Sequence, residues 1–333
     1  MKSHTTETNM FAFLARIRRG AQFSLRRCLL FVLVIAAGMA WVRHERCRIC
    51  DRRGQLELPG ASGIENGLDQ PQWRALLLGD DWPAYTTTYS FPPYAADVTD
   101  DTLSSLEGLI QLKWLAVEGS PVTDAGLKHI TRLTGLNHLL LCDTEITDAG
   151  LQRLEPLDQL VYLNLEGSKV TGRGFSHLRN HVHLSELDAS ECPLNDAGLR
   201  QLSQLKQLRT LRINGTKVTN LGLKYIGELS HLENLELART AITDAGIIYI
   251  GELRGLRSLD LHSTGVTETG LKHLCNLTEL RVLRLEGITI TDHGAECLKT
   301  FRHLEQLVIS GGAISPRVRA DLQNVLRNCT INF

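Results

Sequence analysis

This sequence lacks an excess of either positive or negative charge. It holds 36 Lys and Arg residues against 37 Asp and Glu residues, which gives a formal net charge of -1 and a pI near 6.9. A nucleic-acid-binding surface needs a clustered excess of Lys and Arg to neutralise phosphates. Only the N-terminal segment, up to Arg53, is markedly basic. We therefore expect no nucleic acid partner.

A regular cysteine framework is also missing. The eight cysteines show no even spacing, so the disulfide pattern of small secreted domains is not expected. Cys47 and Cys50 form one Cys-x-x-Cys pair, which supplies two of the four ligands that a structural zinc site usually needs. We expect mostly free thiols and no cofactor, with Cys47 and Cys50 as a candidate metal pair that lacks two ligands.

The sequence has no apolar run of the roughly 20 residues that a membrane-spanning helix usually needs. The longest uncharged apolar run covers 28–42 (CLLFVLVIAAGMAWV). As a helix this run would extend about 22 Å, which is short of the roughly 30 Å hydrocarbon layer. Flanking arginines that snorkel to the interface could still let it span. A signal peptide cleaved after Ala40 and a buried core helix are the other two interpretations.

Membrane orientation is poorly marked, because five arginines precede this run and five follow it. A short basic leader before an apolar run is typical of export signals. We therefore expect a single-pass membrane protein whose repeats lie outside the cytoplasm, with secretion after signal cleavage as the alternative.

A long internal repeat dominates the rest of the chain. The pattern L-x-x-L-x-L-x-x-T-x-I-T-D-x-G-L-x-x-L-x-x-L recurs at a constant spacing from Leu112 onward. Its first leucine stands at positions 112, 136, 160, 184, 208, 232, 256, 280 and 304, so nine units follow one another without an insertion. A half-repeat extends the array back to Val98.

Within each unit the spacing between apolar residues changes from two to about three, and this change predicts a strand followed by a helix. Leu115 and Val117 alternate as in a short strand, whereas Leu127, Ile130 and Leu133 are spaced as on one helix face. The Thr-Asp pair that precedes each helix can cap it. No single unit can bury its own apolar face, so neighbouring units must stack into a solenoid with a shared core.

Two further positions of the repeat, counted from the first leucine of each unit, carry small residues; equivalent positions of successive units form a column. Position nine holds Ser120, Thr144, Ser168, Cys192, Thr216, Thr240 and Thr264, followed by Ile288 and Gly312. We expect these hydroxyl and thiol groups to bond turn backbone groups that stacking removes from water. Position fifteen is Gly in eight units, from Gly126 to Gly294. Glycine there indicates close approach between coils or an unusual backbone angle.

These residues resemble the leucine-rich repeat family, in particular the 24-residue units with a T-D-x-G-L helix start seen in bacterial repeat proteins. The I-T-D-x-G-L element is also similar to the repeats of F-box substrate receptors. The resemblance covers more than two thirds of the chain, from Val98 to the end. The leader Phe23-Ser24-Leu25-Arg26 before an apolar run is similar to membrane-anchored bacterial members of this kind.

We predict an α/β leucine-rich-repeat solenoid, with a parallel sheet on the concave side and helices on the convex side, preceded by an N-terminal apolar helix. Solenoid ends expose core and need caps. Aromatic residues crowd the region before the repeats, and Pro316 interrupts the pattern at the other end. The predicted parts are a basic leader (1–27), the apolar segment (28–42), a flexible linker (43–70), an aromatic N-terminal cap (71–97), the repeats (98–315) and a C-terminal cap (316–333).

Positions three, five and seven of each unit point away from the core, so their columns form the expected binding surface. Large side chains gather at its beginning, where Trp and Tyr favour a binding hot spot. Acidic and basic residues follow, and they could equally neutralise each other as a solvated ladder. The predicted partner-binding residues are Trp114, His138, Leu140, Tyr162, Asn164, Glu186, Asp188, Arg212, Glu236, Asp260 and Arg284.

Features of an active site are absent from the pattern. Glycine-rich phosphate loops and His-Glu metal motifs do not occur. Most histidines recur in register, and the two on the sheet, His138 and His262, would lie roughly 24 Å apart. We therefore predict a monomeric, non-catalytic module that binds a protein or peptide. The alternatives are a structural, self-associating envelope protein and an F-box-like substrate receptor in a degradation pathway, although no F-box-like helical segment precedes the repeats.

Overall fold

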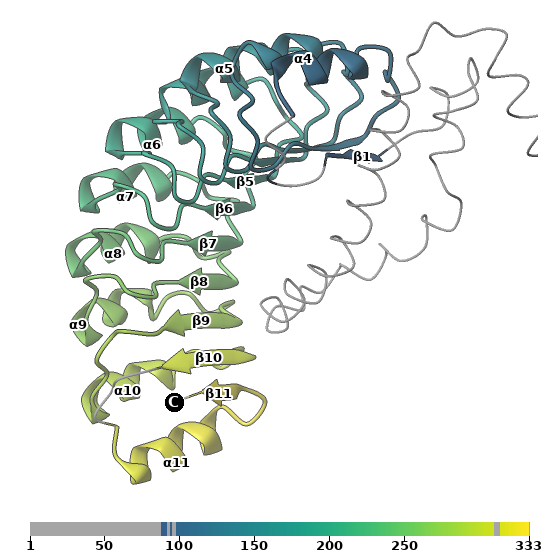
Figure 1. The fold of residues 1–333 in the computed structure, drawn as a ribbon. Helices are drawn as coiled ribbons and strands as arrows, with labels where there is room; N and C mark the ends of the chain where they lie inside the picture. Colours follow the sequence, from purple (N-terminus) through teal and green to yellow (C-terminus); the bar gives the residue numbers. More distant parts are fainter. Residues whose placement is uncertain (1–87, 92–93, 95–97, 310–313, 333) are drawn as a thin grey trace, which may run out of the picture. The chain divides into compact units, whose positions relative to one another are not determined.

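The computed structural model describes residues 88–91, 94, 98–309 and 314–332. The chain divides into two units, residues 1–72 and residues 73–333, and all described residues belong to the second. In that unit eleven strands form one sheet, in which each strand pairs in parallel with the next along the chain (Figure 1). The strands are β1 (Thr88–Ser90), β2 (Trp114–Ala116), β3 (His138–Leu140), β4 (Tyr162–Asn164), β5 (Glu186–Asp188), β6 (Thr210–Arg212), β7 (Asn234–Glu236), β8 (Ser258–Asp260), β9 (Val282–Leu285), β10 (Gln306–Ile309) and β11 (Thr330–Asn332).

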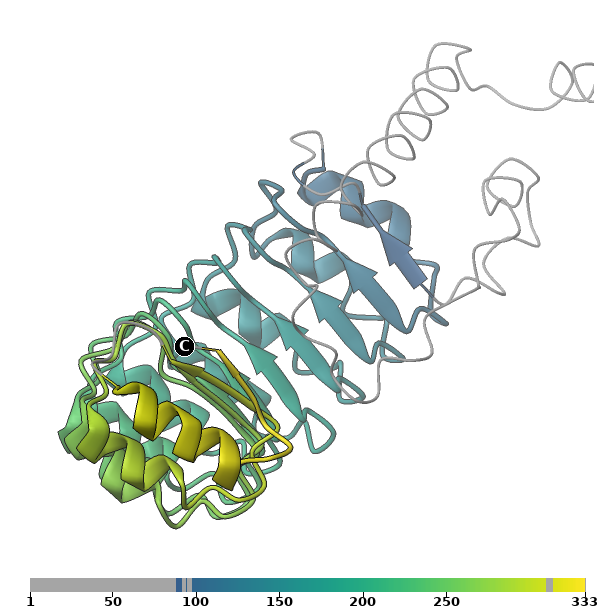
Figure 2. The ribbon, with the colours of Figure 1, turned by 90° about the horizontal axis from the view of Figure 1, so that it is seen from below.

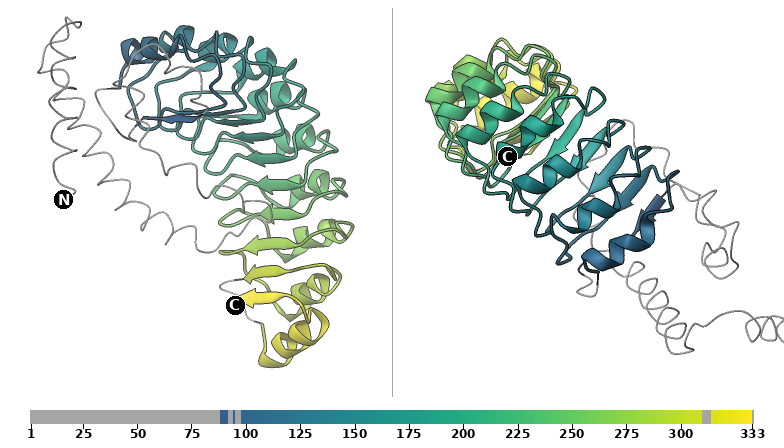
Figure 3. Two further views of the ribbon diagram at one scale, coloured as in Figure 1. Left: turned by 90° about the vertical axis from the view of Figure 1, so that its right-hand side faces the viewer. Right: turned by 90° about the horizontal axis from the view of Figure 1, so that it is seen from above.

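A short helix follows each of the strands β2 to β10, and the helices form a layer on one side of the sheet (Figures 2 and 3). The α-helices are α4 (Asp100–Leu103), α5 (Asp148–Arg153), α6 (Asp196–Leu202), α7 (Asn220–Ile226), α8 (Asp244–Ile250), α9 (Glu268–Leu271), α10 (Asp292–Leu298) and α11 (Pro316–Val325). The 3₁₀ helices are η1 (Ser104–Leu106), η2 (Gly126–His129), η3 (Arg173–Leu178) and η4 (Lys272–Leu274). This arrangement confirms the predicted solenoid with a parallel sheet and a helix layer.

The predicted apolar helix at 28–42 and the linker at 43–70 lie outside the described residues, so they remain predictions. No helix in the described part of the chain is long and apolar enough to cross a membrane. The two predicted caps also remain predictions. Strand β1 lies within the segment assigned to the N-terminal cap, and α11 with β11 lies within the C-terminal one.

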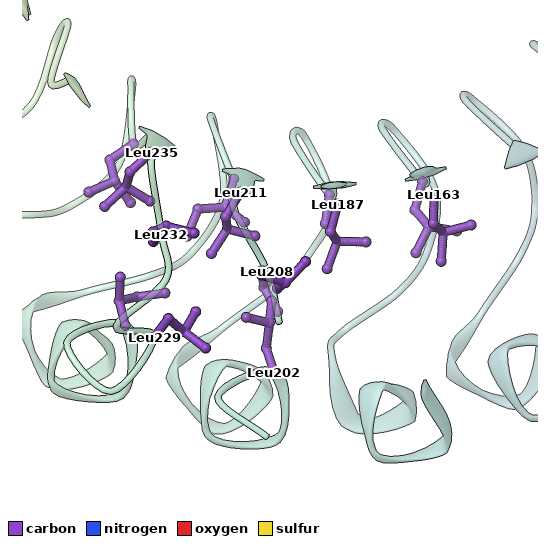
Figure 4. Packing of buried hydrophobic residues seen from close by; sticks show 14 of the residues in the cluster. Leu163, Leu187, Leu202, Leu208, Leu211, Leu229, Leu232 and Leu235 are labelled. Carbon is purple, nitrogen blue, oxygen red and sulfur yellow. The ribbon is translucent and has the colours of Figure 1, made fainter. Parts of the chain in front are cut away.

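The leucines of successive coils stack in rows beneath the sheet. Leu163, Leu187, Leu211 and Leu235 lie side by side on neighbouring strands, and leucines of the turns and helices fill the space below them (Figure 4). These side chains have 0% exposure, as does Leu115. Each coil therefore buries its apolar face only because the next coil covers it.

A ladder of carboxylates links the helix starts of successive coils. Asp124 accepts hydrogen bonds from the backbone N–H of Thr147 (2.8 Å) and from its hydroxyl (2.6 Å), one coil further on. The same backbone N–H bond joins Asp100 to Thr123, Asp148 to Thr171, Asp196 to Thr219, Asp244 to Thr267, Glu268 to Thr291 and Asp292 to Ser315. Asn220 takes the place of the carboxylate in one coil: it accepts from Thr243 N–H (2.9 Å), and its Nδ2 donates to the Thr243 hydroxyl (2.7 Å).

The Thr-Asp pair therefore acts differently from the sequence prediction, in which both residues cap one helix. Thr147 does accept from Ala149 N–H in its own coil (3.2 Å), as predicted. The carboxylate of Asp148 instead bonds the following coil, at the hydroxyl of Thr171 (2.5 Å). The prediction was wrong about the Asp because a single sequence does not show which coil the side chain reaches.

The glycine column makes room for this carboxylate ladder. A Cβ on Gly222 would lie 2.5 Å from Asp196 Oδ1 and 2.8 Å from Leu199 Cδ1, both in the preceding coil. A real Cβ cannot approach so closely, so the side chains there would have to shift. Of the two reasons predicted for these glycines, close approach between coils is the one that applies at Gly222.

The third coil, which begins at Leu160, departs from the pattern at Gly172. Other coils carry at this position the side chain that bonds the next coil, a carboxylate or the amide of Asn220. The φ of Gly172, 98°, is left-handed, which glycine adopts without strain. The N–H groups of Gly172 and Gly174 bond Asp148 Oδ1 (both 3.0 Å), and the helix that follows, η3, is of the 3₁₀ type. A Cβ on Gly198 would lie 2.9 Å from the Gly172 Cα, so these two coils approach backbone to backbone.

His181 occupies a leucine position in the same coil. It is 1% exposed, and its Nε2 lies 3.0 Å from the Leu154 carbonyl oxygen of the preceding coil. Burial lowers the pKa of His181, so the neutral ring that donates to this carbonyl is favoured. The polar ring is thus accommodated in the leucine row by one hydrogen bond to the neighbouring coil.

At position nine the four threonines and Cys192 make the predicted bonds to turn carbonyls, whereas the buried Ser120 hydroxyl has no partner among the described residues. The Thr144 hydroxyl donates to the Leu141 carbonyl oxygen (2.8 Å), and Thr216 makes the same bond to Ile213 (2.8 Å). Both threonines are buried. Their hydroxyls therefore satisfy turn carbonyls that stacking has removed from water.

Replacing Gly222 with Ala places a methyl group against Asp196 and Leu199, so we expect a loss of roughly 1 to 2 kcal/mol of unfolding free energy, measured by urea titration. Gly108→Ala is the matched control, since a Cβ there meets nothing within 4 Å. Adding Asp196→Ala to Gly222→Ala should make the combined loss smaller than the sum of the two single losses. Equal losses at Gly222 and Gly108 would contradict the packing role of this column.

Candidate partner-binding surface

Three aromatic side chains stand in register on neighbouring strands. Trp114 on β2 pairs with His138 on β3, and His138 pairs with Tyr162 on β4. The rings of His138 and Tyr162 lie edge to face, with centroids 6.2 Å apart. Leu140 stands two residues beyond His138, on the same side of β3. We call these four residues the aromatic row; all are half-buried.

The aromatic row faces away from the core because strand side chains alternate. Leu115, Leu139 and Leu163, which lie between the outward positions of β2, β3 and β4, have 0% exposure. Their neighbours along each strand must therefore point to the opposite face of the sheet, which none of the helices in the described part of the chain covers (Figure 1). The structure brings the four predicted anchors together there.

The predicted charged residues continue the surface over the next strands. Asp188, Arg212, Glu236, Asp260 and Arg284 pair in sequence across β5 to β9. Arg212 Nε donates to Glu236 Oε1 (3.1 Å), and Arg284 Nη1 lies 3.8 Å from Asp260 Oδ2. Burial acts to lower the pKa of Arg212, but the carboxylates of Glu236 and Asp188 outweigh it and raise the pKa. Within this column, opposite charges therefore neutralise each other.

Three of the predicted residues bond their own backbone. The side-chain oxygens of Asn164, Asp188 and Asp260 accept from the N–H two residues further on, at distances of 2.8, 3.0 and 2.8 Å. Asn164 and Asp188 are each only 7% exposed. These two side chains therefore hold the bend after their strands and offer little surface to a partner.

Position seven adds side chains that the sequence prediction did not include among the binding residues. Glu118, Cys142 and Glu166 follow β2, β3 and β4 and occupy outward positions beside the aromatic row. Alternation in the sequence already placed position seven outward, but no residue of this column was among the predicted binding residues. These residues make the aromatic end of the surface more acidic than the prediction implied.

The pKa values of this region reflect its burial and its negative charge. Burial, followed by the carboxylate of Asp188, raises the pKa of Glu166. The same two causes raise the pKa of the Tyr162 hydroxyl well above its ordinary value. Burial and the carboxylates of Glu118 and Glu166 likewise raise the pKa of the Cys142 thiol. A positive group placed here would relieve this repulsion.

Metal binding has no candidate among the residues that the structure describes. No group of three or more His, Cys, Asp and Glu side chains within that part of the chain is placed to hold a metal ion. The sequence candidate Cys47 and Cys50 lies outside those residues, so that prediction stays untested.

Comparison with known proteins places the fold. A family profile described as "Leucine Rich repeat" matches residues 228–251. The solved LRR protein LIC12759 of Leptospira interrogans is 22% identical with a TM-score of 0.52, and the match covers 69% of this chain and 62% of that one. The chain therefore spans less than two thirds of the length of that protein. No curated protein matches the sequence.

Two further solved structures are similar at lower scores. An internalin C2 from Listeria monocytogenes is 24% identical with a TM-score of 0.48, covering 70% of this chain and 92% of that one. A plant peptide hormone receptor in complex with RGF2 is 17% identical with a TM-score of 0.46, covering 69% of this chain and 45% of that one.

Substitutions at Asp188 separate its charge from its hydrogen bond. Asn keeps an oxygen that can accept from Ser190 N–H, whereas Ala loses it and should cost roughly 1 to 2 kcal/mol of unfolding free energy. Burial raises the pKa of Asp188, so its ionised form destabilises the folded state at neutral pH. We therefore expect Asp188→Asn to be at least as stable as the parent at pH 7.

The stability difference between the Asp188→Asn variant and the parent should shrink as the pH falls towards 3.8, the ordinary pKa of Asp, because the carboxyl of the folded parent takes up its proton first and the buried charge is lost. Urea titrations at pH 7 and at pH 4 measure this difference. A loss with Asn at pH 7 as large as the loss with Ala would show that the charge itself is needed.

Proposed function

We propose that the sheet face opposite the helix layer binds a protein or peptide without catalysing a reaction. The leucine-rich repeats and the parallel sheet support this proposal, because no helix of the described residues lies on that face. The aromatic row is the proposed anchor. The observation that carries the proposal is the register of β2, β3 and β4, which sets Trp114, His138 and Tyr162 side by side on that face.

The aromatic row suits this role for physical reasons. Trp and Tyr bury a large area while losing few rotatable bonds, which is why binding hot spots favour them. The rings are already half-buried by their neighbours, so little further ordering is needed when a partner arrives. Three strands at a spacing of about 4.8 Å set the rings along roughly 10 Å, a length that three or four residues of an extended peptide can cover.

The acidic side chains around the aromatic row define the preferred partner more closely. Glu118 and Glu166 flank the row at position seven, and Glu186 follows Tyr162 at position three. Arg212 is paired with Glu236 and so does little to offset them. The proposed partner segment therefore carries Lys or Arg beside an apolar side chain, and a cation can also rest on the Trp114 ring.

Selection of peptides from a displayed library on the immobilised full chain tests the proposal. We expect the selected peptides to carry basic and apolar residues together and to bind more weakly as salt is added. The double substitution Trp114→Ala with Tyr162→Ala should weaken their binding by roughly tenfold or more, measured by titration calorimetry.

Gln306→Ala is the matched control, because Gln306 occupies position three at the far end of the same sheet. Unchanged affinity in the double variant, or an equal loss in the control, would dispose of the aromatic row as the anchor. The proposed binder is a monomer, so light scattering that shows the full chain in large assemblies would favour the structural, self-associating alternative instead.

We also propose that residues 28–42 tether the chain to a membrane and place the repeats outside the cytoplasm, with release after signal cleavage as the alternative. The support is the uncharged run between arginines. Cell fractionation should recover the full chain with membranes, and protease added outside the cells should digest the repeats. Recovery of intact, protease-protected chain in the cytoplasmic fraction would contradict this location.

A further inference from the structure

Two cysteines meet between the seventh and eighth coils, which begin at Leu256 and Leu280. Cys275 follows η4, and Cys297 lies in α10 of the next coil. Their sulfur atoms are 2.6 Å apart, and both side chains are partly exposed. Both thiols also point at one acceptor, the Leu271 carbonyl oxygen, at 3.9 Å for Cys275 and 3.3 Å for Cys297.

The place where these thiols meet is a recurring contact of the fold. Cys275 occupies position twenty of its coil, and Cys297 occupies position eighteen of the next. Three other pairs of successive coils fill the same two positions with polar side chains in contact. These are Glu107 with His129, Glu155 with His177 (2.6 Å) and Lys299 with Asp321 (2.9 Å). Positions twenty and eighteen therefore form a slot in which side chains of successive coils meet.

The coil that contains Cys297 also lacks a contact that earlier coils have. Ile288 stands at its position nine, where Thr264 in the preceding coil donates to the Leu261 carbonyl oxygen (2.8 Å). A link through the helix layer would strengthen the array at the point where the hydroxyl column ends.

We propose that Cys275 and Cys297 form a reversible disulfide that cross-links the seventh and eighth coils, with a small-molecule disulfide such as oxidised glutathione as the oxidant. The two sulfurs need to approach by only about half an ångström to reach the bonded distance. The disulfide takes the place of the polar contact that three other pairs of coils make in the same slot.

The chemistry balances as two thiol–disulfide exchanges. One thiolate attacks a sulfur of oxidised glutathione, which releases one glutathione and leaves a mixed disulfide. The second cysteine then loses its proton and displaces the other glutathione. Two protein S–H bonds and one S–S bond are broken, while one protein S–S bond and two glutathione S–H bonds form. The protein loses two electrons and two protons, and glutathione gains them.

The surroundings of the thiols make the exchange depend on pH. Burial, together with the neighbouring Cys275, raises the pKa of the Cys297 thiol to about 12. Exchange needs a thiolate, so cross-linking should become faster as the pH rises. Whichever cysteine attacks first, the other then acts on a sulfur that is already in contact with it.

The test uses the full chain incubated with oxidised glutathione, alkylated and digested with trypsin without reduction. The two cysteines fall in separate tryptic peptides, 273–281 and 285–299, each with one cysteine. We expect mass spectrometry to find these peptides joined, lighter by two hydrogens, and separated again after reduction. In Cys275→Ser and Cys297→Ser the joined peptide should vanish, whereas Cys329→Ser, at a half-buried cysteine of the C-terminal strand region, should retain it.

Two results would overturn the proposal. One is that Cys275 and Cys297 remain alkylated, or carry glutathione, under conditions in which Cys329 already carries glutathione. The other concerns the strength of the cross-link, which closes a loop of 22 residues (297 − 275). Oxidation should raise the thermal midpoint of the parent by about 5 to 10 °C, and that of Cys275→Ser by nothing. A cross-linked parent with an unchanged midpoint would show that the bond does not hold the coils together.

Discussion

Burial of each coil's leucines by the next coil is the interaction on which the rest of the molecule depends. Each repeat unit presents strand and helix leucines that it cannot cover alone. Leu163, Leu187 and Leu211 are fully buried because successive coils lie against one another. A fully buried Leu contributes about 1.5 to 3 kcal/mol, so even a one-residue shift between coils would cost several such contributions at once. This explains why the units follow one another without an insertion.

The polar links between coils are arranged so that stacking remains possible. Carboxylates at the helix starts bond the next coil, and Gly222 leaves the space that the carboxylate of Asp196 needs. These links, the hydroxyl column and the slot that holds Cys275 and Cys297 all lie in the turns and the helix layer. The aromatic row takes no part in these links, and this leaves it available for a partner.

Much of this organisation could be predicted from the sequence, because a strict period fixes which residues are equivalent. The parallel sheet, the buried columns at positions four and six, and the alignment of Trp114, His138 and Tyr162 all follow from the period alone. Contacts between coils could not be predicted in the same way. The partner of Asp124 lies 23 residues away, and the meeting of Cys275 with Cys297 depends on helix geometry.

The backbone role of Asn164 and Asp188 was also missed, for a related reason. Alternation along a strand shows which face a side chain takes, but it does not show that a short polar side chain bends back onto its own turn. Glu118 and Glu166 were within reach of the same alternation argument and belong to the same surface. The candidate site is therefore best described as an aromatic row with acidic flanks, with Asn164 and Asp188 supporting the turns beside it.

Hydrogen exchange followed by mass spectrometry on Leu211→Ala tests most directly whether coils depend on their neighbours. Leu211 is fully buried on β6, between β5 and β7. If each coil is stable only through the next, protection should fall in the peptides of β5 and β7 as well as β6, and less so at β2 and β10. Loss of protection confined to β6 would mean that coils are stable by themselves and would contradict this account.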